Sequence, residues 1–210
     1  MMAGKKQFDV DAVLDAAMVQ FWRAGYADTS VDDLSRTTGL NRSSLYSSFG
    51  DKDALYLRCL DRYAARYGDR YERALSPAVE EPRQKERAED AVQAVQAVQA
   101  FFEVTLQRIA DPDVPDGCLI AQTAMASAVL SPAIAARAVR ALGLQQARLR
   151  TALGAAPLAE SEAGDFAVHL AAVNQSLAVM SRAGASQKQL RTIVDVSLSA
   201  LSRAVRAGGR

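Results

Sequence analysis

Glycine and proline, the residues that most readily interrupt helices, are scarce in this sequence. Its 210 residues contain only 12 glycines and 6 prolines. Aromatic residues make up 6% of the chain while alanine recurs throughout, a composition that favours long helices over many short strands. A chain of this length forms one large domain or a small domain joined to a medium one, and either buries a sizeable core. We therefore expect an all-α protein.

The overall composition excludes several classes of protein. Hydrophobic residues account for 50% of the chain and charged residues for 23%, as in soluble globular proteins, which argues against disorder, collagen-like structure and a disulfide scaffold. No apolar stretch follows Lys5 and Lys6, so we expect no secretory signal. No segment approaches the roughly 20 apolar residues of a membrane helix. We expect a cytoplasmic protein with no membrane partner.

Neither the spacing of the cysteines nor the net charge indicates a particular chemical function. Cys59 and Cys118 match no metal-ligand spacing, so we expect reduced thiols and neither a metal nor a cofactor. The formal net charge is +1, and residues 1–55 hold six lysines and arginines against eight aspartates and glutamates. Bulk charge therefore does not indicate nucleic-acid binding, and any such function must depend on where the basic residues lie.

Three helices with clear boundaries are predicted in the first 50 residues. Residues 8–24 place apolar side chains at three- and four-residue steps, and Gly25 follows. Residues 30–33 have the S-x-x-D form of a capping box, and Gly39 suits the end of a short second helix. Asn41 can cap a third helix over residues 42–48. Two short helices joined by a tight turn form a helix-turn-helix pattern.

A long fourth helix is expected to begin at Asp51 or Asp53 and to end near Leu75. It carries a stripe of arginines, which we interpret as a solvated face, and we interpret the early acids Asp9, Asp11 and Asp15 of the first helix as solvated caps. Residues 76–83 include two prolines and suggest a linker. The predicted domains are 1–50 (helix-turn-helix), 51–76 (connecting helix) and 77–210 (C-terminal domain).

The remaining helices are expected at residues 85–110, 118–129, 132–153, 161–181 and 186–205, which makes about nine in all. Apolar stripes on the last two would form either core or a four-helix dimer interface, with the interface slightly favoured. The residues assigned to this dimerisation face are Phe166, Leu170, Val173, Leu177, Leu190, Ile193, Val194, Ser197, Leu198 and Leu201.

Residues 21–34 and 38–55 resemble the TetR family of bacterial transcriptional regulators. The second segment contains a Tyr-x-x-Phe-x-x-Lys-x-x-Leu signature formed by Tyr46, Phe49, Lys52 and Leu55. The resemblance implies an N-terminal three-helix DNA-binding domain followed by a C-terminal helical ligand-binding and dimerisation domain. It further implies a regulator, usually a repressor, that binds palindromic operator DNA as a homodimer and is released by a small-molecule inducer or an electrophile.

The resemblance and the physical chemistry suggest the same DNA contacts. Short polar side chains on the third helix suit base edges, and Tyr46 and Lys52 resemble the phosphate-binding residues of the family. Thr29 and Thr38 are weaker phosphate candidates. The predicted DNA-binding set is Thr29, Thr38, Arg42, Ser43, Ser44, Tyr46, Ser47 and Lys52. The acids Asp28, Asp32 and Asp33 lie near this surface, so we expect modest, salt-sensitive affinity.

In the resemblance, helices five to eight enclose a ligand pocket. The candidate lining residues are Phe101, Phe102, Thr105, Cys118, Gln122, Met125 and His169. The apolar members suit the core equally well, and His169 better suits a core or interface position than a ligand or switch. Cys118 lies in a Gly-Cys-Leu segment similar to one in some family members that sense electrophiles, although a buried hydrophobic role is the alternative.

Two other classes of function are alternatives to a regulator. A helical enzyme would need a base, a nucleophile or a metal cluster, and one histidine with two distant cysteines offers little for catalysis, so we expect no enzymatic activity. The second class is a ligand-binding or protein-interaction module whose helix-turn-helix does not read DNA. The acidic balance of the N-terminal region keeps this alternative open.

Overall fold

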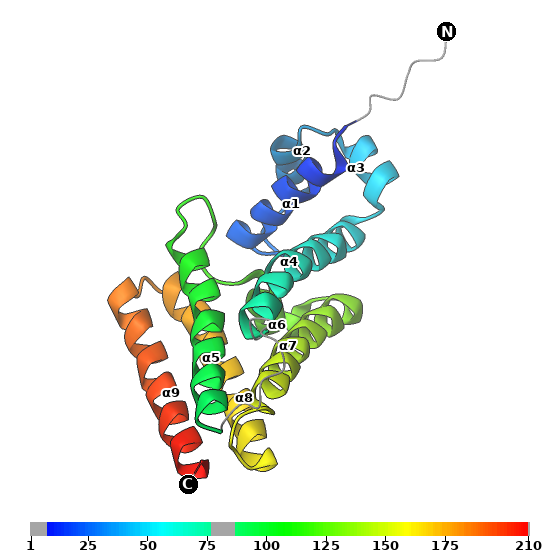
Figure 1. Ribbon diagram of the computed structural model, residues 1–210. Helices are drawn as coiled ribbons and strands as arrows, with labels where there is room; N and C mark the ends of the chain where they lie inside the picture. Colours follow the sequence, from blue (N-terminus) through cyan, green and yellow to red (C-terminus); the bar gives the residue numbers. More distant parts are fainter. Residues whose placement is uncertain (1–7, 77–86, 210) are drawn as a thin grey trace.

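The computed structural model describes residues 8–76 and 87–209, and the regular elements in these ranges are all helical (Figure 1). They are α1 (Val10–Ala24), α2 (Val31–Thr38), α3 (Arg42–Phe49), α4 (Lys52–Leu75), α5 (Arg87–Ala110), α6 (Leu119–Met125), the 3₁₀ turn η1 (Ser127–Val129), α7 (Pro132–Leu153), α8 (Glu160–Arg182) and α9 (Gln187–Gly208). For these ranges, the prediction of an all-α fold with about nine helices is confirmed.

Most predicted boundaries agree with the observed ones, and the sixth helix is the main exception. Predicted to reach residue 129, it ends at Met125 and the chain tightens into η1. The chain then turns into α7, which begins with Pro132, a residue whose fixed backbone angle suits the first turn of a helix. Of the predicted linker, only Ser76 is described. Its N–H donates a hydrogen bond to the Glu72 carbonyl at 2.9 Å, where α4 ends. The predicted start at Lys85 lies outside the described residues.

Short polar side chains begin each of the first three helices. Asp9 accepts hydrogen bonds from two N–H groups of α1, Ser30 accepts from the Asp33 N–H at 3.1 Å, and Asn41 begins α3. Gly39 has φ 71°, the left-handed conformation that glycine adopts without strain, so α2 and α3 meet in a tight turn. The local sequence therefore determines the helix-turn-helix.

Aromatic side chains join α1 to the long helix α4. The ring of Trp22 meets the rings of Tyr63 and Tyr67 edge-on, at centroid distances of 4.9 and 6.0 Å, and Phe21 meets Tyr56 at 4.7 Å. All five side chains are buried. Because α4 also packs against α5, α6 and α7, it connects the helix-turn-helix to the rest of the molecule.

Ion pairs add a polar connection between the same two helices. The carboxylate of Asp15 accepts from Arg62 at 2.7 and 2.8 Å and also from Arg66, and Asp11 accepts from Arg62 at 2.6 Å. The Arg62 hydrogen bonds are the main reason that the pKa of Asp15 lies below its usual value. The interpretation of the early acids as solvated caps holds for Asp9 alone, and the arginine stripe is not simply a solvated face.

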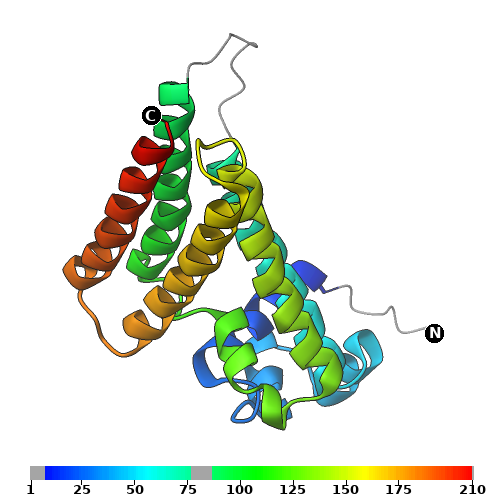
Figure 2. The same ribbon diagram turned by 90° about the horizontal axis from the view of Figure 1, so that it is seen from below.

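The C-terminal helices form a bundle in which α5, α8 and α9 lie side by side and α7 contacts both α4 and α8 (Figures 1 and 2). Phe101, Phe102 and Leu106 of α5 are buried in its centre. The helix-turn-helix lies at one end of the molecule, beyond the first turns of α4, and the C-terminus lies at the opposite end (Figure 1).

The apolar stripes of α8 and α9 face the interior of the subunit. Leu170, Leu177, Leu190 and Leu201 have no exposed surface, and Val194 and Ser197 are also buried. A side chain enclosed within one subunit cannot contact a second subunit, so the prediction of a dimerisation face is wrong for these six residues. The four remaining members of that set are half-buried and pack against the core, namely Phe166, Val173, Ile193 and Leu198.

None of the described helices combines the length and the apolar character that crossing a bilayer would require.

Candidate functional site

The helix α3 presents a polar face to solvent. Arg42, Ser43, Tyr46 and Ser47 are exposed, and Ser44 is half-buried. On its other side, Leu45 and Phe49 are buried against the rest of the N-terminal unit, which fixes the orientation of the helix. The sequence-predicted base-contacting residues therefore lie together on one accessible surface, and Tyr46, 48% exposed, lies beside them.

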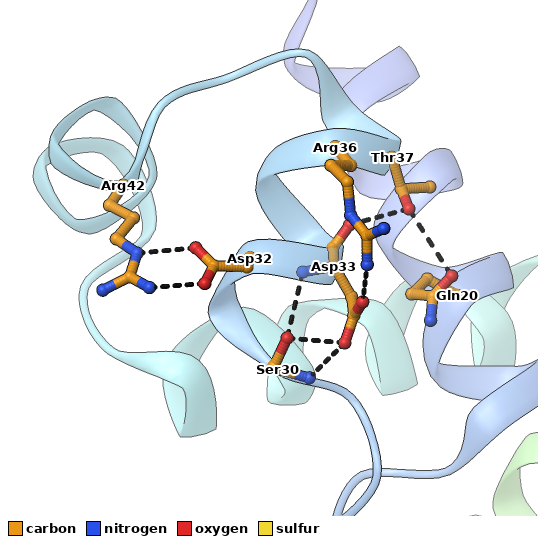
Figure 3. A network of polar contacts seen from close by, with 7 residues as sticks. All are labelled: Gln20, Ser30, Asp32, Asp33, Arg36, Thr37 and Arg42. Atoms are coloured by element: carbon orange, nitrogen blue, oxygen red, sulfur yellow. Dashed lines mark hydrogen bonds and ion pairs between the residues drawn. The ribbon is translucent and has the colours of Figure 1, made fainter.

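Arg42 is engaged by a carboxylate of the neighbouring helix. Its guanidinium donates two hydrogen bonds to Asp32 of α2, at 2.8 and 2.6 Å (Figure 3). This pair raises the pKa of Arg42, chiefly through the hydrogen bonds to Asp32. Both side chains remain exposed, so water can replace the contact at small cost. Sequence reasoning placed both residues near this surface and missed that they bind each other.

The remaining contacts in Figure 3 hold α2 in place. Ser30 and Asp33 form a reciprocal capping box, and Arg36 donates to the same Asp33 carboxylate. Thr37 donates to the Asp33 carbonyl at 2.8 Å and reaches Gln20 of α1 at 3.4 Å. Asp33 thus stabilises the start of α2, whereas Asp32 binds Arg42 on the exposed surface of α3.

Lys52 begins α4 and is half-buried beside α1. Its ammonium group lies 4.2 Å from the centre of the Tyr26 ring, a cation–π contact. Burial is the main cause that lowers the pKa of Lys52. Tyr26 in turn donates to Asp53, and burial followed by this hydrogen bond raises the pKa of the tyrosine. These contacts therefore fix the position of Lys52 at the start of α4, as a phosphate contact would require.

The two threonine candidates have internal roles. Thr29 is fully buried and donates to the Gly25 carbonyl at 2.6 Å, so the prediction of a phosphate contact is wrong for this residue. Thr38 is half-buried, donates to the Leu34 carbonyl at 2.7 Å and accepts from the Leu40 N–H at 3.3 Å. Its hydroxyl therefore stabilises the turn between α2 and α3.

A cavity of about 260 Å³ lies between α4, α5, α6, α7 and α8, and we call it the ligand cavity. Tyr63, Tyr67 and Tyr71 of α4 form one wall, and Asn174 of α8 also lines the cavity. Among the residues predicted to line a ligand pocket, Cys118 lines this cavity. Thr105 lies behind the wall, where it donates to Asn174 at 2.6 Å and shares a hydrogen bond with Tyr71 at 2.7 Å.

The other predicted pocket residues lie elsewhere. Phe101 and Phe102 are core residues with no exposed surface, because the α5 face that carries them packs inside the bundle. Gln122 and Met125 lie with Cys118 along a groove of about 510 Å³ between α6 and α8, on the outside of the molecule, and Met125 is 75% exposed. His169 is exposed on α8 and lies 3.5 Å from the hydroxyl of Ser197 on α9.

A larger cleft of about 540 Å³ lies near the far ends of α4, α5 and α7. It adjoins the ligand cavity through Leu144 and Arg148, and it includes the acids Glu72 and Asp90. Glu72 accepts a hydrogen bond from Arg148 at 3.1 Å. Two of the helices that line the smaller cavity, α4 and α6, contact α1, and this cavity contains a buried charged group.

That group is Arg108, which sequence reasoning missed. It is 4% exposed, donates to the Gly117 carbonyl and faces the rings of Trp22 and Tyr67, each 5.6 Å away. A signal was available in the sequence. Arg108 follows Phe101 by seven positions and Thr105 by three, which places a cation on the buried face of α5.

The two thiols differ in their surroundings. Cys59 is buried within α4, and burial raises its pKa to about 12, so it is a structural residue. Cys118 is half-buried at the start of α6, where it borders both the ligand cavity and the outer groove. The neighbouring Tyr63 is fully enclosed, and burial is the main cause that raises the pKa of its hydroxyl. In the parts of the chain that the structure describes, no group of three or more histidine, cysteine or acidic side chains is arranged to hold a metal ion.

The family model of bacterial regulatory proteins of the tetR family matches residues 13–59, and the model of the LmrA/YxaF-like transcriptional regulator C-terminal domain matches residues 94–196. The Escherichia coli HTH-type transcriptional repressor ComR is 29% identical over 199 residues, which cover 92% of this chain and 89% of ComR. An uncharacterised HTH-type transcriptional regulator of Bacillus subtilis, YezE, is 29% identical over 207 residues, 95% of this chain and all of YezE.

Solved structures agree over nearly the whole length. A cysteine mutant of the TetR family regulator CifR, complexed with 26-base-pair operator DNA, superposes with a TM-score of 0.72 at 25% identity and covers 98% of this chain and 99% of its own. A TetR regulator from Chloroflexus aurantiacus has a TM-score of 0.73 at 21% identity, with 93% of each chain covered. The helix-turn-helix, the C-terminal bundle and both family matches lead to one assignment: the chain belongs to the TetR family of bacterial transcriptional regulators.

Proposed function

We propose that this chain is a ligand-responsive transcriptional repressor that binds palindromic operator DNA as a homodimer. The observation that carries the proposal is the polar face of α3, where Arg42, Ser43 and Ser47 are accessible while Leu45 and Phe49 anchor the helix. The relatives support it, since ComR is named a transcriptional repressor and CifR was solved with operator DNA. A regulator of this kind acts in the cytoplasm and catalyses no reaction.

Each of the three predicted domains would have its own role. Residues 1–50 would read DNA, and residues 77–210 would bind the ligand and the second subunit. Residues 51–76 would connect these two parts. Because α4 contacts α1 on one side and lines the ligand cavity on the other, a ligand that shifts α4 changes the position of α3. Two recognition helices must lie about 34–36 Å apart to read successive major grooves, so a small shift is enough to weaken binding.

The dimer would form on the outward faces of α8 and α9. Val168, Val179 and Val196 are 53%, 46% and 65% exposed, although valine is usually buried. His169 and Ser197, the neighbours of Val168 and Val196, lie 3.5 Å apart, which brings the two helices together at this point. Packing these faces against their copies would form a four-helix interface.

Release could use either chemistry that the family resemblance implies. A reversible ligand would occupy the ligand cavity, and an electrophile would react at Cys118 on its border. Substituting Cys118→Ser separates the two. If release from DNA by an electrophile persists unchanged in this variant, the thiol is not the sensor.

The test of the proposal is a mobility-shift assay with the DNA upstream of the chain's own gene. We expect specific retardation by the wild-type protein and at least about tenfold weaker binding by Arg42→Ala, since a bidentate contact to a base contributes about 1–3 kcal/mol. Arg73→Ala, at an exposed position near the end of α4 that is remote from α3, is the matched control and should bind like the wild type. No specific retardation even at low salt would favour the interaction-module alternative.

A further inference from the structure

The ligand cavity contains a buried cation with incomplete hydrogen bonding. Arg108 donates one hydrogen bond to the Gly117 carbonyl, while its Nε has no hydrogen-bond partner in the described ranges 8–76 and 87–209. The rings of Trp22 and Tyr67 flank the guanidinium, and they offer weak attraction without a formal counter-charge. Arg108 therefore retains donor capacity and lines a space large enough for a ligand.

No acidic residue compensates this charge from the cavity wall. The described residues that line the cavity include Arg108 and Arg148 but neither aspartate nor glutamate. Arg148 is partly exposed and has Glu72 as its ion-pair partner, so its charge is already balanced. A buried cation without a counter-ion is costly, and an anionic ligand is the partner that would remove the cost and complete the hydrogen bonds.

The rest of the cavity is suited to a flat apolar body. Three tyrosine rings line one side, with Ile120 of α6 and Leu142 of α7 also in the wall. A cavity of roughly 150 Å³ holds one benzene molecule, so the space of about 260 Å³ has room for a single ring and a short acidic side chain. Aromatic walls also favour stacked or edge-on contacts with such a ring.

We propose that the ligand cavity binds a small aromatic carboxylate, with its carboxylate on the Arg108 guanidinium and its ring among Tyr63, Tyr67 and Tyr71. The inference rests on the proposed function in that it names the chemical class of the ligand for the same site. It assigns to Arg108 the role of the charge-recognising residue, because the guanidinium presents planar donors that match a carboxylate.

The test compares acids with their neutral analogues. Phenylacetate and phenylpropanoate are titrated against phenylacetamide and phenylpropanamide, which share the ring and shape but carry no charge. Binding is measured calorimetrically and by the fluorescence of Trp22, the single tryptophan of the chain, whose ring faces Arg108. We expect at least one acid to bind and to do so at least about tenfold more tightly than its amide, since hydrogen bonds to charged groups are the stronger kind.

Substitutions test whether Arg108 is the residue that causes the preference for the acid over its amide. In Arg108→Gln the acid should lose its advantage over the amide, whereas Arg108→Lys should keep part of it. The control Arg140→Gln, at an exposed position on α7 that does not line the cavity, should keep all of it. Circular dichroism checks that each variant is folded. If Arg108→Gln does not fold, the comparison of acid with amide on the wild-type protein decides the matter. Failure of both acids to bind, equal binding of acid and amide, or an unchanged preference in folded Arg108→Gln would each overturn the proposal.

The outcome is independent of whether the protein reads DNA. All titrations use the full chain without DNA, and operator binding is measured separately. Retardation of operator DNA together with no acid binding would refute the ligand class and leave the regulator standing. Acid binding with no specific retardation of DNA would support the cavity chemistry and refute the repressor.

Discussion

Arg182, the last residue of α8, donates a hydrogen bond to the main-chain carbonyl of Trp22 in α1 at 3.2 Å. It also donates to the Arg23 carbonyl at 2.8 Å and to the Gln122 side chain of α6 at 2.8 Å. A guanidinium at the C-terminal end of α1 satisfies carbonyls that have no partner within the helix and complements the helix dipole. The ligand-binding bundle therefore holds the DNA-reading unit directly, in addition to its connection through α4.

The first prediction concerns this contact. Replacing Arg182 with Met should reduce the free energy of unfolding by about 1–2 kcal/mol, because two carbonyls at the end of α1 lose a charged donor. Arg140→Met, at an exposed position on α7, should change it by less than about 0.5 kcal/mol. Urea unfolding followed by circular dichroism measures both. Equal effects of the two substitutions would show that the Arg182 contact does not stabilise the fold.

The second prediction concerns the pair on the DNA-reading surface. Asp32→Asn should tighten operator binding about two- to fivefold, because it frees Arg42 from an exposed ion pair and removes a negative charge near the phosphates. The control Asp69→Asn removes an exposed carboxylate from α4. Fluorescence anisotropy with labelled operator measures the affinities. Weaker binding by Asp32→Asn would mean that Asp32 positions Arg42 for DNA and does not restrain it.

The third prediction concerns Lys52. If its ammonium group binds a phosphate, Lys52→Gln should reduce the slope of log K against log salt concentration by about 0.9 for each of the two subunits. Lys188→Gln on α9 is the matched control and should leave the slope unchanged. An unchanged slope in Lys52→Gln would limit the role of Lys52 to its contact with Tyr26.

The fourth prediction concerns pH. The pKa of Asp15 is lowered in the folded protein, so its pairing with Arg62 stabilises the fold fully above the unfolded-state pKa of about 3.9 and loses this effect as the pH falls through the lower folded value. Asp15 is partly exposed, so after allowance for solvent screening we expect Asp15→Asn to cost about 1 kcal/mol near neutral pH. The difference from the wild type should shrink below about pH 4. A difference that persists in acid would exclude the ion pair as its cause.

The helices themselves could be predicted from sequence because their signals are local. Ser30, Gly39 and Asn41 mark boundaries through interactions within a few residues, and all three act as expected. The accessible face of α3 was predictable for the same reason, since Leu45 and Phe49 are the large apolar residues that anchor it.

The cavity and the subunit surfaces depend on contacts between distant segments, which periodicity does not specify. The stripe through Leu170 and Leu177 shows that α8 buries one face, but the pattern is the same whether the partner is α5 or a second subunit. The burial of Arg108 could not be predicted from its position in the sequence, because a cation near the end of a helix ordinarily stabilises the helix dipole. Only the approach of Trp22, from far along the chain, shows that this cation is enclosed.

If two copies of α3 read one palindromic operator, each duplex must bind two subunits, and this number can be measured. Light scattering of the complex should give two subunits per duplex. Val196→Asp should weaken both subunit pairing and operator binding, while the control Val139→Asp, at an equally exposed position on α7, should weaken neither. A single subunit bound to the operator with undiminished affinity, or the absence of any specific complex, would show that the chain does not read operator DNA as a homodimer.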